Sequence, residues 1–476
     1  MSLGPAIDEL LRLRDAPAIA SGEVSIGGSD PFFKTPFKAG ETTAASLAAI
    51  GIAANDIWEI RTGRRQKIGV AVRHAAATLR TGDYTVRRDE AGAYENIPIP
   101  AAQAHMLTVT QPWRTKDGRY FLPHLNLPNL AERVLGVLKC ENTPQGVSGA
   151  VGRWNADDLE EAIAEARACG GKIRSPSEWR AHPQGGYLAG RPVIEITRTG
   201  DAPPEAFHAG ERPLSGVRVL DLTRILAGPI AGRTLAEHGA DVLMVTDENL
   251  PQTPEHVRDT SHGKRSCFLN LKREADAKQF AALMREADVV IDGYRPGRLA
   301  HLGFGIDSLM SLRPGIVYLS ISCFGSGGPF AARAGWEQIA QAVTGVCHVQ
   351  GERTGAGQPK LVFAPMCDYN TGYLAAYGVM LALARRSREG GSWKVNASLC
   401  QSAMFIQRQG LLQDFMNAPG QLSEAELAEN YVCADTCYGT LKTLGPALRM
   451  SQTPPHWARP TPRLGSDKPE WLPRPI

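Results

Sequence analysis

The chain has 476 residues, of which 43% are hydrophobic and 21% are charged. This length and balance are typical of a soluble globular protein with two or three domains, and they exclude a single small module. The formal net charge of +3 is too small to predict a nucleic-acid or membrane partner, so any anion site must be local.

The cysteines and the N-terminus favour a cytoplasmic protein. The nine cysteines are scattered singles, and the close pair Cys433 and Cys437 lacks a second pair that could complete a zinc site, so we expect reduced thiols and no metal. The N-terminus has acidic residues and no apolar core of a signal peptide, and no uncharged run approaches the ~20 residues that span a bilayer. We therefore expect no nucleic-acid partner and no membrane partner.

Two segments of the chain repeat each other at a constant offset, 374 − 47 = 327 residues. Residues 47–76 and 374–403 both read as an Ala-rich helix, a basic turn with Gly, a strand and a second Ala-rich helix. Ala-rich helices can resemble each other by chance, but here the turn and the strand also match without a gap. We interpret residues 1–110 as a partial large-domain segment that repeats the region near 370–410.

Residues 111–203 are predicted to form a separate, smaller α+β domain. A hairpin strand feeds a helix over 113–138, and an amphipathic helix with an Asn/Asp start and a Gly stop covers 154–171. The Pro- and charge-rich residues 204–215 are predicted to be a linker. Residues 411–476, which end in a Pro- and Trp-rich stretch, are predicted to be an extended strap over a partner surface.

The region 216–410 carries the clearest α/β pattern. Apolar runs at 217–222 and 241–245 flank a helical pattern that follows the Ala-Gly-Pro turn at 227–229, which is typical of a βαβ unit. Further buried strands are predicted at 267–271, 288–293 and 316–322, separated by helical stretches. The predicted fold class is therefore α/β, with a Rossmann-like doubly wound parallel sheet and a second, smaller α+β domain.

Six ordered segments of this region resemble class III CoA-transferases, the CaiB/BaiF family, which also includes α-methylacyl-CoA racemases. They are GVRVLDLTRILAGP, HGADVLMV, HGKRSCFLNLK, ADVVIDGYRPGRLAHLGFG, YLSISCFGSGGP and DYNTGYLAAYGVMLALARR. Residues 40–200 resemble the family's later portion, so the module order is rearranged. The resemblance implies acyl-CoA and a small carboxylic acid as partners, coenzyme A as substrate rather than a permanently bound cofactor, and an interlocked homodimer or a paralogous subunit.

A crevice beyond the carboxyl ends of the parallel strands is the expected ligand site. Ile225, Leu226 and Ala227 follow the first strand and would form the wall of this crevice. The turn lacks the G-x-G-x-x-G of dinucleotide enzymes, which makes an NAD enzyme the weaker interpretation.

The resemblance implies further contacts with CoA, whose phosphates need cations or backbone amides. The family's residues that match Lys264 and Arg265 neighbour the nucleotide, and His262 lies in the same loop; a solvated basic turn is the alternative. Tyr294 and Arg295 end another strand where family members hold CoA. His301 falls where some members carry a phosphate-binding Arg. The predicted CoA-binding residues are therefore Ile225, Leu226, Ala227, His262, Lys264, Arg265, Tyr294, Arg295 and His301.

The catalytic carboxylate is not at the family's position. In the transferases an Asp in a T-G-x-x-D-G-P-P motif attacks the acyl-CoA carbonyl, whereas the corresponding VQGERTGAGQP has Thr354 there, which cannot form the mixed anhydride. Glu352 is two residues away. Glu337 matches the Asp that racemases use, although a helix N-terminal acid is its alternative role. Glu337 and Glu352 are thus the catalytic candidates, and Asp368 is predicted to be a helix N-cap.

The leading prediction is a CoA-transferase that moves CoA between an acyl-CoA and a carboxylic acid. One alternative is an acyl-CoA racemase or epimerase centred on Glu337. A second is a CoA-binding subunit without catalysis.

Overall fold

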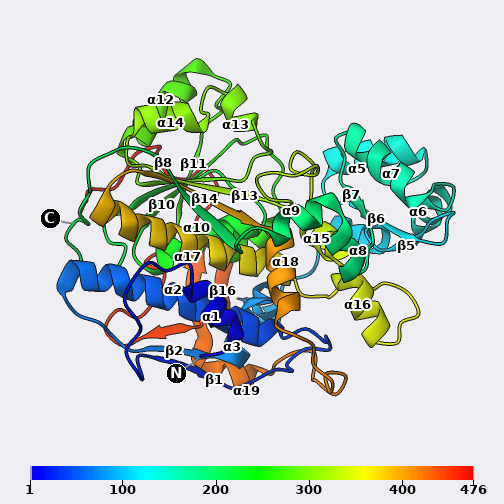
Figure 1. Ribbon diagram of the computed structural model, residues 1–476, viewed down its shortest axis with the longest axis horizontal. Helices are drawn as coiled ribbons and strands as arrows, with labels where there is room; N and C mark the ends of the chain where they lie inside the picture. The colour runs from blue at the N-terminus through cyan, green and yellow to red at the C-terminus, as the bar shows by residue number, and fades with distance from the viewer. Residues whose placement is uncertain (1–2, 475–476) are drawn as a thin grey trace.

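A seven-stranded sheet forms the centre of the computed structural model, which describes residues 3–474 (Figure 1). Its order is β11-β10-β9-β12-β13-β14-β8, and all neighbours are parallel except the antiparallel pair β14 and β8. The strands are β8 (Ile194–Gly200), β9 (Arg218–Asp221), β10 (Asp241–Thr246), β11 (Arg265–Phe268), β12 (Val289–Asp292), β13 (Val317–Ser322) and β14 (Ser392–Ser398). The predicted α/β class with a large parallel sheet is confirmed.

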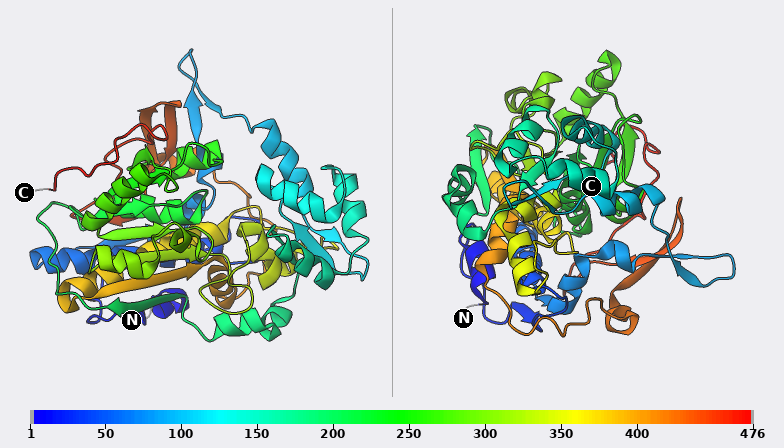
Figure 2. Two further views of the ribbon diagram at one scale, coloured as in Figure 1. Left: turned by 90° about the horizontal axis from the view of Figure 1, so that it is seen from above. Right: turned by 90° about the vertical axis from the view of Figure 1, so that its right-hand side faces the viewer.

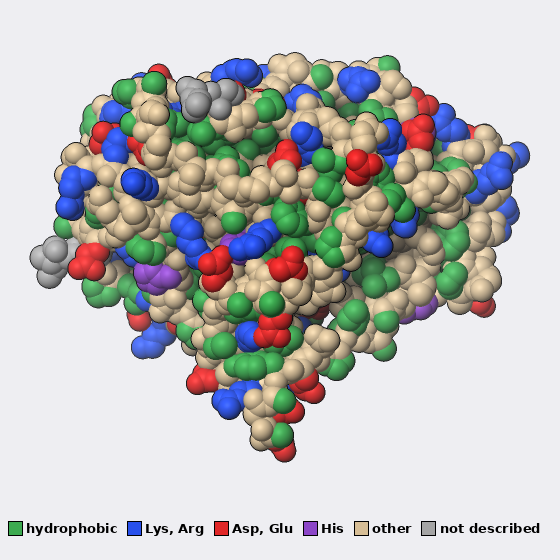
Figure 3. Space-filling model, turned by 90° about the horizontal axis from the view of Figure 1, so that it is seen from below, with side chains coloured by type: hydrophobic (Ala, Val, Ile, Leu, Met, Phe, Trp, Pro, Cys, Tyr) green, Lys and Arg blue, Asp and Glu red, His purple; other side chains and the backbone are tan. Residues whose placement is uncertain are grey.

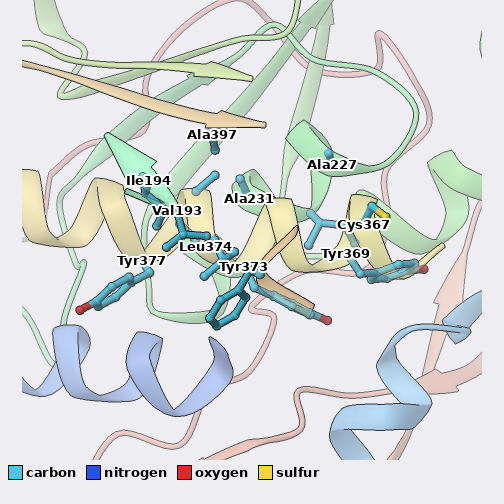
Figure 4. Close-up of a cluster of buried hydrophobic side chains, with 14 of the residues drawn as sticks. Val193, Ile194, Ala227, Ala231, Cys367, Tyr369, Tyr373, Leu374, Tyr377 and Ala397 are labelled. Atoms are coloured by element: carbon cyan, nitrogen blue, oxygen red, sulfur yellow. The ribbon is translucent and has the colours of Figure 1, made fainter. Parts of the chain in front are cut away.

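The central strands are apolar throughout because both of their faces are covered. Every residue of β9 and β12 is buried. The main covering helices are α10 (Ala227–Glu237), α12 (Glu274–Glu286) and α17 (Met366–Glu389). Figure 4 shows Tyr373 and Tyr377 of α17 pointing away from the sheet towards another long helix, so α17 lies in the interior rather than on the surface.

The repeat in the sequence is also a repeat in the structure. Helix α2 (Ala39–Thr62) and α17 each have 24 residues, and their starts differ by 366 − 39 = 327 positions. Strand β2 (Ile68–Ala71) and helix α3 (Val72–Thr78) follow α2 just as β14 and α18 (Leu399–Arg408) follow α17. The two long helices pack against each other below the sheet (Figure 1).

The two repeats exchange a strand. In a second sheet, β2 lies between the parallel β1 (Val24–Gly27) and the antiparallel β17 (Leu448–Met450), as β14 lies between β13 and β8. Thus β17, late in the chain, completes the sheet of the N-terminal repeat, and β8, early in the chain, completes that of the C-terminal repeat. The sequence analysis grouped β8 with the smaller domain of residues 111–203, and the pairing with β14 corrects this boundary.

Two glycines allow this exchange. A Cβ on Gly51 of α2 would lie 2.8 Å from Ile68 Cγ2 and 3.0 Å from Leu448 Cδ1. A Cβ on Gly378 of α17, at 378 − 51 = 327 positions further, would lie 2.7 Å from Val395 and 3.0 Å from Ile194. Each helix therefore touches its own strand and the exchanged strand through a position that has no room for a side chain.

The smaller domain has its own apolar core. Buried side chains between Val109 and Ala168 form a separate cluster, and the domain is a distinct lobe in Figures 1 and 2. Its elements are β5 (Trp113–Arg114), β6 (Tyr120–Pro123), α5 (Pro128–Leu138), α6 (Pro144–Val151), α7 (Ala156–Glu165) and β7 (Gly170–Lys172). The predicted hairpin and both predicted helices are present.

The remaining elements lie around these two bodies. They are α1 (Pro5–Leu11), η1 (Thr81–Tyr84), β3 (Val86–Arg88), β4 (Tyr94–Asn96), α4 (Ala101–Val109), α8 (Pro176–Ala181), α9 (Pro183–Ala189), α11 (Pro254–Thr260), α13 (Arg298–His301), α14 (Ile306–Leu312), α15 (Glu337–Thr344), α16 (Val346–Arg353), α19 (Glu424–Leu427), η2 (Ala428–Asn430), β15 (Tyr431–Thr436) and β16 (Gly439–Leu444).

The C-terminal region is extended only after β17. The prediction of a strap over all of residues 411–476 is wrong for its first part, because β15 and β16 form a hairpin that pairs with β3. Beyond β17 the chain follows the outer edge of β11, where Asp467 N donates to Ser266 O at 2.7 Å. It then crosses the amino ends of the strands, where Arg218 donates to Leu472 O at 2.9 Å. The tail thus covers the edge strand β11.

Charges of both signs are interspersed over the lower face of the molecule (Figure 3). Within residues 3–474, no helix has both the length and the apolar character needed to cross a membrane.

The exchange predicts opposite effects for glycine-to-alanine changes. Gly51→Ala and Gly378→Ala should each lower the free energy of unfolding by about 1–3 kcal/mol, because the new methyl group overpacks a closed contact. Gly136→Ala in α5 is the matched control, since a Cβ there meets nothing within 4 Å, and it should raise stability by about 0.5–1 kcal/mol. Urea unfolding measures all three. Equal effects at Gly51 and Gly136 would contradict the packing of the exchanged strands.

Candidate active site

The carboxyl edge of the large sheet contains a crevice where the strand order reverses. β9, the first strand of its region, lies between the second strand, β10, and the fourth, β12. Such a switch point is where open α/β sheets bind ligands. The turns after β9 and β12 approach closely at the Thr223 side chain. A Cβ on Gly228 would lie 2.4 Å from that side chain, and a Cβ on Gly293 would lie 3.0 Å from it.

The turn after β9 has an unusual backbone. Ile225 has a φ of 78°, which is rare for a β-branched residue and costs of the order of 1–3 kcal/mol. Leu226 then serves as the N-cap of α10, and Ala227 is its first residue. The three residues predicted as the crevice wall thus form a strained strand-to-helix turn at the switch point.

A buried ion pair fixes this turn. Lys264 Nζ donates to Asp221 Oδ2 and to Pro229 O, both at 2.7 Å, and neither charged side chain is exposed. Asp221 Oδ1 accepts from Thr223 N at 3.0 Å. Lys264 was predicted to contact the nucleotide. Its charge is instead paired with Asp221, and two of its N–H groups donate within the turn.

His262 and Arg265 also have internal partners. His262 stacks on Trp457 at 4.5 Å, and burial lowers the pKa of its imidazole to about 4. Arg265 pairs with Asp241 at 2.9 Å and donates to Glu470 O at 2.8 Å. The loop is thus neither a phosphate clamp nor a solvated turn, because the C-terminal tail and β10 bury it. We leave all three basic residues out of the ligand contacts proposed below.

Arg295 lies at the junction of the two domains. Its Nη1 and Nη2 donate to Arg167 O of the smaller domain at 3.2 Å and 3.1 Å, and Arg133 Nη1 donates to the same oxygen at 3.1 Å. Partial burial and the charges of Arg133 and Arg167 lower the pKa of Arg295. Within residues 3–474 no carboxylate forms an ion pair with any member of this arginine cluster, which we define as Arg133, Arg167 and Arg295.

Tyr294 and His301 lie near the same edge. Tyr294 is half-buried beside β12, and its backbone N donates to Asp292 Oδ1 at 2.8 Å. Burial raises the pKa of its phenol, and the nearby Arg224 charge opposes that rise. His301 is exposed at the end of α13. Both side chains remain open to a ligand.

Glu337 is a buried acid that caps a helix. It is 4% exposed, and its carboxylate accepts from Gln341 Nε2 at 2.7 Å, from Cys367 N at 3.2 Å and from Asp368 N at 2.6 Å. The last two donors belong to the first turn of α17, where a negative charge is favoured. Burial raises the pKa of Glu337. The contacts of Glu337 therefore agree with its alternative role as an acid at a helix N-terminus. The helix that it caps is α17 and not its own helix α15.

Asp368 is not the N-cap of α17. The helix begins two residues earlier, at Met366, with Pro365 as its N-cap, because Pro readily precedes or opens a helix. Asp368 lies in the first turn, buried beside Glu337. Burial first, and the charge of Glu337 second, raise the pKa of Asp368 well above its ordinary value.

Glu352 has the opposite surroundings. It is exposed on the last turn of α16, and its carboxylate has no hydrogen-bond or ion-pair partner in the part of the chain that the structure describes. Thr354 follows as the C-cap, and its hydroxyl donates to Gln350 O at 2.6 Å. Of the two candidate acids, only Glu352 has a carboxylate free to meet a ligand.

The model of CoA-transferase family III matches residues 214–459, more than half of the chain. The chain belongs to CoA-transferase family III. The family match begins just before β9 and ends in the extended tail, so it includes the crevice, Glu337 and Glu352.

Individual relatives in family III extend the similarity. An acyl-CoA transferase of Gibberella moniliformis is 32% identical over 80% of this chain and 73% of its own length. The succinate–glutarate CoA-transferase of Agrobacterium fabrum is 35% identical over 41% of this chain and 54% of its own. The succinyl-CoA:glutarate CoA-transferase of Mus musculus is 34% identical over 42% and 48%. The chain therefore spans most of the first relative but only about half of the other two.

Solved structures of related chains overlap in part. A CaiB/BaiF family protein from Brucella suis is 27% identical, with a TM-score of 0.39 over 48% of this chain and 65% of that one. The hypothetical protein Rv3272 from Mycobacterium tuberculosis is 31% identical, with a TM-score of 0.38 over 41% and 57%.

The family motifs gave no signal for two members of the arginine cluster. Arg133 and Arg167 lie in the smaller domain, more than a hundred residues before Arg295, and neither is part of a recognisable motif. Only the folded arrangement brings them to the family III crevice. Arg167 is exposed just beyond α7 and has a left-handed φ of 52°, neither of which the sequence indicated.

Two substitutions of Ile225 test whether its backbone is strained. In the middle of a helix or strand, a protein with Gly is less stable than the same protein with Ala by about 0.5–1 kcal/mol. Here Ile225→Gly should be more stable than Ile225→Ala by about 1 kcal/mol, because both remove the side chain and only Gly accepts the positive φ without strain. Urea unfolding of the two variants gives this difference directly. The ordinary order, with Ala more stable, would show that the turn is not strained.

Removing the charge of Asp368 should alter the pH dependence of stability. Because the folded pKa lies above the ordinary 3.8, the stability that Asp368 contributes is complete below that value and is lost as the pH rises towards the folded pKa. Asp368→Asn should therefore gain stability relative to the natural chain between pH 5 and pH 8, by more than about 1 kcal/mol. Asp307→Asn, on the exposed face of α14, controls for the loss of one charge. A constant difference across this pH range would contradict the assignment.

Proposed function

We propose that this protein is a CoA-transferase that moves CoA between an acyl-CoA and a carboxylic acid. The observation that carries the proposal is a switch-point crevice with an arginine cluster at its edge, in a chain of family III that also has an exposed, unpartnered carboxylate at Glu352. The strand order around β9 supports a Rossmann-like, doubly wound reading of the sheet. The relatives named acyl-CoA transferase and succinate–glutarate CoA-transferase support the same reaction. Coenzyme A acts here as substrate and not as a permanent cofactor.

The arginine cluster is the proposed phosphate contact. Three guanidinium groups without a carboxylate partner favour a multiply charged anion, and guanidinium groups bind phosphate oxygens in pairs. Ile225, Leu226 and Ala227 would line the crevice, with Tyr294 beside them and His301 at its rim. Because Arg133 and Arg167 come from the smaller domain, a CoA phosphate would join the two domains.

Glu352 is the proposed nucleophile. Its carboxylate attacks the acyl-CoA carbonyl, the C–S bond breaks, and CoA leaves as a thiolate, which gives a mixed anhydride between the acyl group and Glu352. The thiolate then attacks the glutamyl carbonyl, which releases the first acid as a carboxylate and leaves a Glu352–CoA thioester. A second carboxylate repeats these steps in reverse, which forms the new acyl-CoA and restores Glu352.

The two rival functions are less well supported. A racemase centred on Glu337 needs an acid that reaches the α-proton of the substrate, but the carboxylate of Glu337 is buried and accepts three internal hydrogen bonds. A CoA-binding subunit without catalysis has no need of a carboxylate, whereas Glu352 is exposed and unpartnered. Transfer through Glu352 accounts for both observations.

We further propose that the chain contains two related modules in rearranged order. The second module contains all six strands from β9 to β14. Each repeat is completed by a strand from the other, so a second chain is not needed to close either sheet. The homodimer and the cytoplasmic location predicted from the sequence remain predictions. Light scattering of the purified protein would give the number of chains.

Trapping the covalent intermediate tests the reaction. The protein is incubated with succinyl-CoA, then treated with borohydride or hydroxylamine, and peptides are analysed by mass spectrometry. We expect the modification on Glu352, because reduction or hydroxamate formation occurs at an activated carboxyl. Glu352→Gln should lose the modification and reduce transfer to glutarate at least a thousand-fold, whereas Glu389→Gln, a second exposed acid, should retain both.

The same assay addresses the phosphate contact. Arg133→Gln should raise the KM for succinyl-CoA about tenfold with little change in kcat, because the lost contact binds ground state and transition state alike. Arg198→Gln on β8 is the matched exposed control. Full transfer activity in Glu352→Gln, or a label confined to Glu337, would overturn the assignment of the nucleophile.

A further inference from the structure

A second cavity lies between the α8–α9 segment and the helices α16 and α18, and it is lined by both halves of the chain. Its volume is about 460 Å³, within the range of small-molecule sites. The N-terminal half contributes Glu9, Phe37 and the α8–α9 segment with Trp179, and the C-terminal half contributes α16 and α18 with Val349 and Met404. The cavity, which we call the interhalf groove, therefore exists only because the two halves interlock.

Apolar side chains form part of the walls of the interhalf groove. Trp179 is 1% exposed, and its Nε1 donates to Met404 Sδ at 3.3 Å, so the two side chains hold each other in place. Phe37 and Leu411 form a β-bridge at the other wall. Leu411 is 38% exposed, which leaves an apolar surface facing the opening. An occupant with an apolar body would gain by covering this surface.

The rim of the interhalf groove carries surplus positive charge. Arg408 is neutralised by Glu9 at 2.6 Å. Arg191 has Glu195 only at 3.7 Å and lies over the Tyr187 ring. Arg180 has no ion-pair or side-chain hydrogen-bond partner in residues 3–474. Two arginines are therefore left to meet an anion, and a carboxylate fits the paired donors of a guanidinium group.

We propose that the interhalf groove binds the acid substrate of the reaction, a carboxylic acid with an apolar body of medium length. The apolar body lies against Trp179, Met404 and Leu411, and an acidic group pairs with Arg180 and Arg191. This assignment rests on the proposed transfer for the identity of the occupant as a substrate. A neutral or cationic occupant would leave the two arginines unpaired, and a small acid such as acetate would leave the apolar walls uncovered.

The position of α16 connects the groove to the chemistry. Val349 lines the groove, and Glu352 lies three residues further along the same helix. Residues three apart share a face of a helix. Glu352 itself is outside the groove lining, so an acid bound beside Val349 lies about one helical turn of α16 from the proposed nucleophile.

Calorimetric titration of the full chain with octanoate tests the assignment. Octanoate should bind saturably, and octanamide, which has the same body without the charge, should bind at least tenfold more weakly. Ala189→Trp places a large ring in the groove from an exposed position on α9 and should abolish octanoate binding. Ala181→Trp, exposed on α8 and outside the groove lining, is the matched control and should bind octanoate normally.

A charge variant separates the two parts of the site. Arg180→Gln combined with Arg191→Gln should weaken octanoate at least tenfold and leave octanamide unchanged, whereas Arg198→Gln should change neither. Octanoate binding that is unaffected by Ala189→Trp, or that is absent in the natural chain, would overturn the proposal. CoA binding and labelling of Glu352 are measured on the same variants. If CoA binding and labelling are absent while octanoate binds, the proposed transfer is refuted and the groove assignment stands. If CoA binding and labelling are present while octanoate does not bind, only the groove assignment is refuted.

Discussion

The rest of the molecule depends on two close contacts, in which each of two long helices meets two strands, α2 at Gly51 and α17 at Gly378. At each glycine a helix meets a strand of its own repeat and a strand from the other half of the chain, with no room for a methyl group. Neither half can complete its sheet alone, since β8 and β17 are exchanged. The segment of α8 and α9 connects the smaller domain to β8 and so to the large sheet. Arg295, which follows β12, donates to Arg167 O of that domain.

The crevice depends on a second constraint, the buried pair of Asp221 and Lys264. Burying two charges is favourable only with short contacts and satisfied remaining groups, and both conditions hold, since Lys264 also donates to Pro229 O and Asp221 also accepts from Thr223. These bonds hold the ends of the turn in which Ile225 has its positive φ. The ion pair thus stabilises a backbone conformation that the local sequence does not favour. A basic residue in a ligand-binding motif can therefore shape the ligand site without touching the ligand, because it fixes the backbone of the turn that borders the site.

The sequence was sufficient for what depends on local pattern. The strands of region 216–410, the repeat at offset 327 and the smaller domain follow from hydrophobic period and turn residues, and the structure contains them. What the sequence could not show depends on long-range burial. Lys264 and Arg265 were predicted to contact the nucleotide, with a solvated turn as the alternative, and the structure gives both side chains internal partners. Strand β8 could not be assigned to its sheet, because an exchanged edge strand has the same apolar pattern as one that pairs with its neighbours in sequence. Arg133 and Arg167 were missed for the same reason.

The two acids singled out from the sequence illustrate how burial separates a structural carboxylate from a reactive one. Glu337 and Glu352 lie on the consecutive short helices α15 and α16, which contact each other, and both were catalytic candidates from the sequence. The backbone amides at the start of α17 take up the carboxylate of Glu337, which ties α15 to the helix that carries Gly378. Glu352 lies beyond this network, on the final turn of α16. The loss of an Asp at Thr354 therefore need not remove a carboxylate from this helix end. A glutamate two residues earlier has one more methylene and lies about one helical turn from Val349, which lines the interhalf groove. An acid substrate held in the groove, as proposed above, would therefore approach this carboxylate along α16.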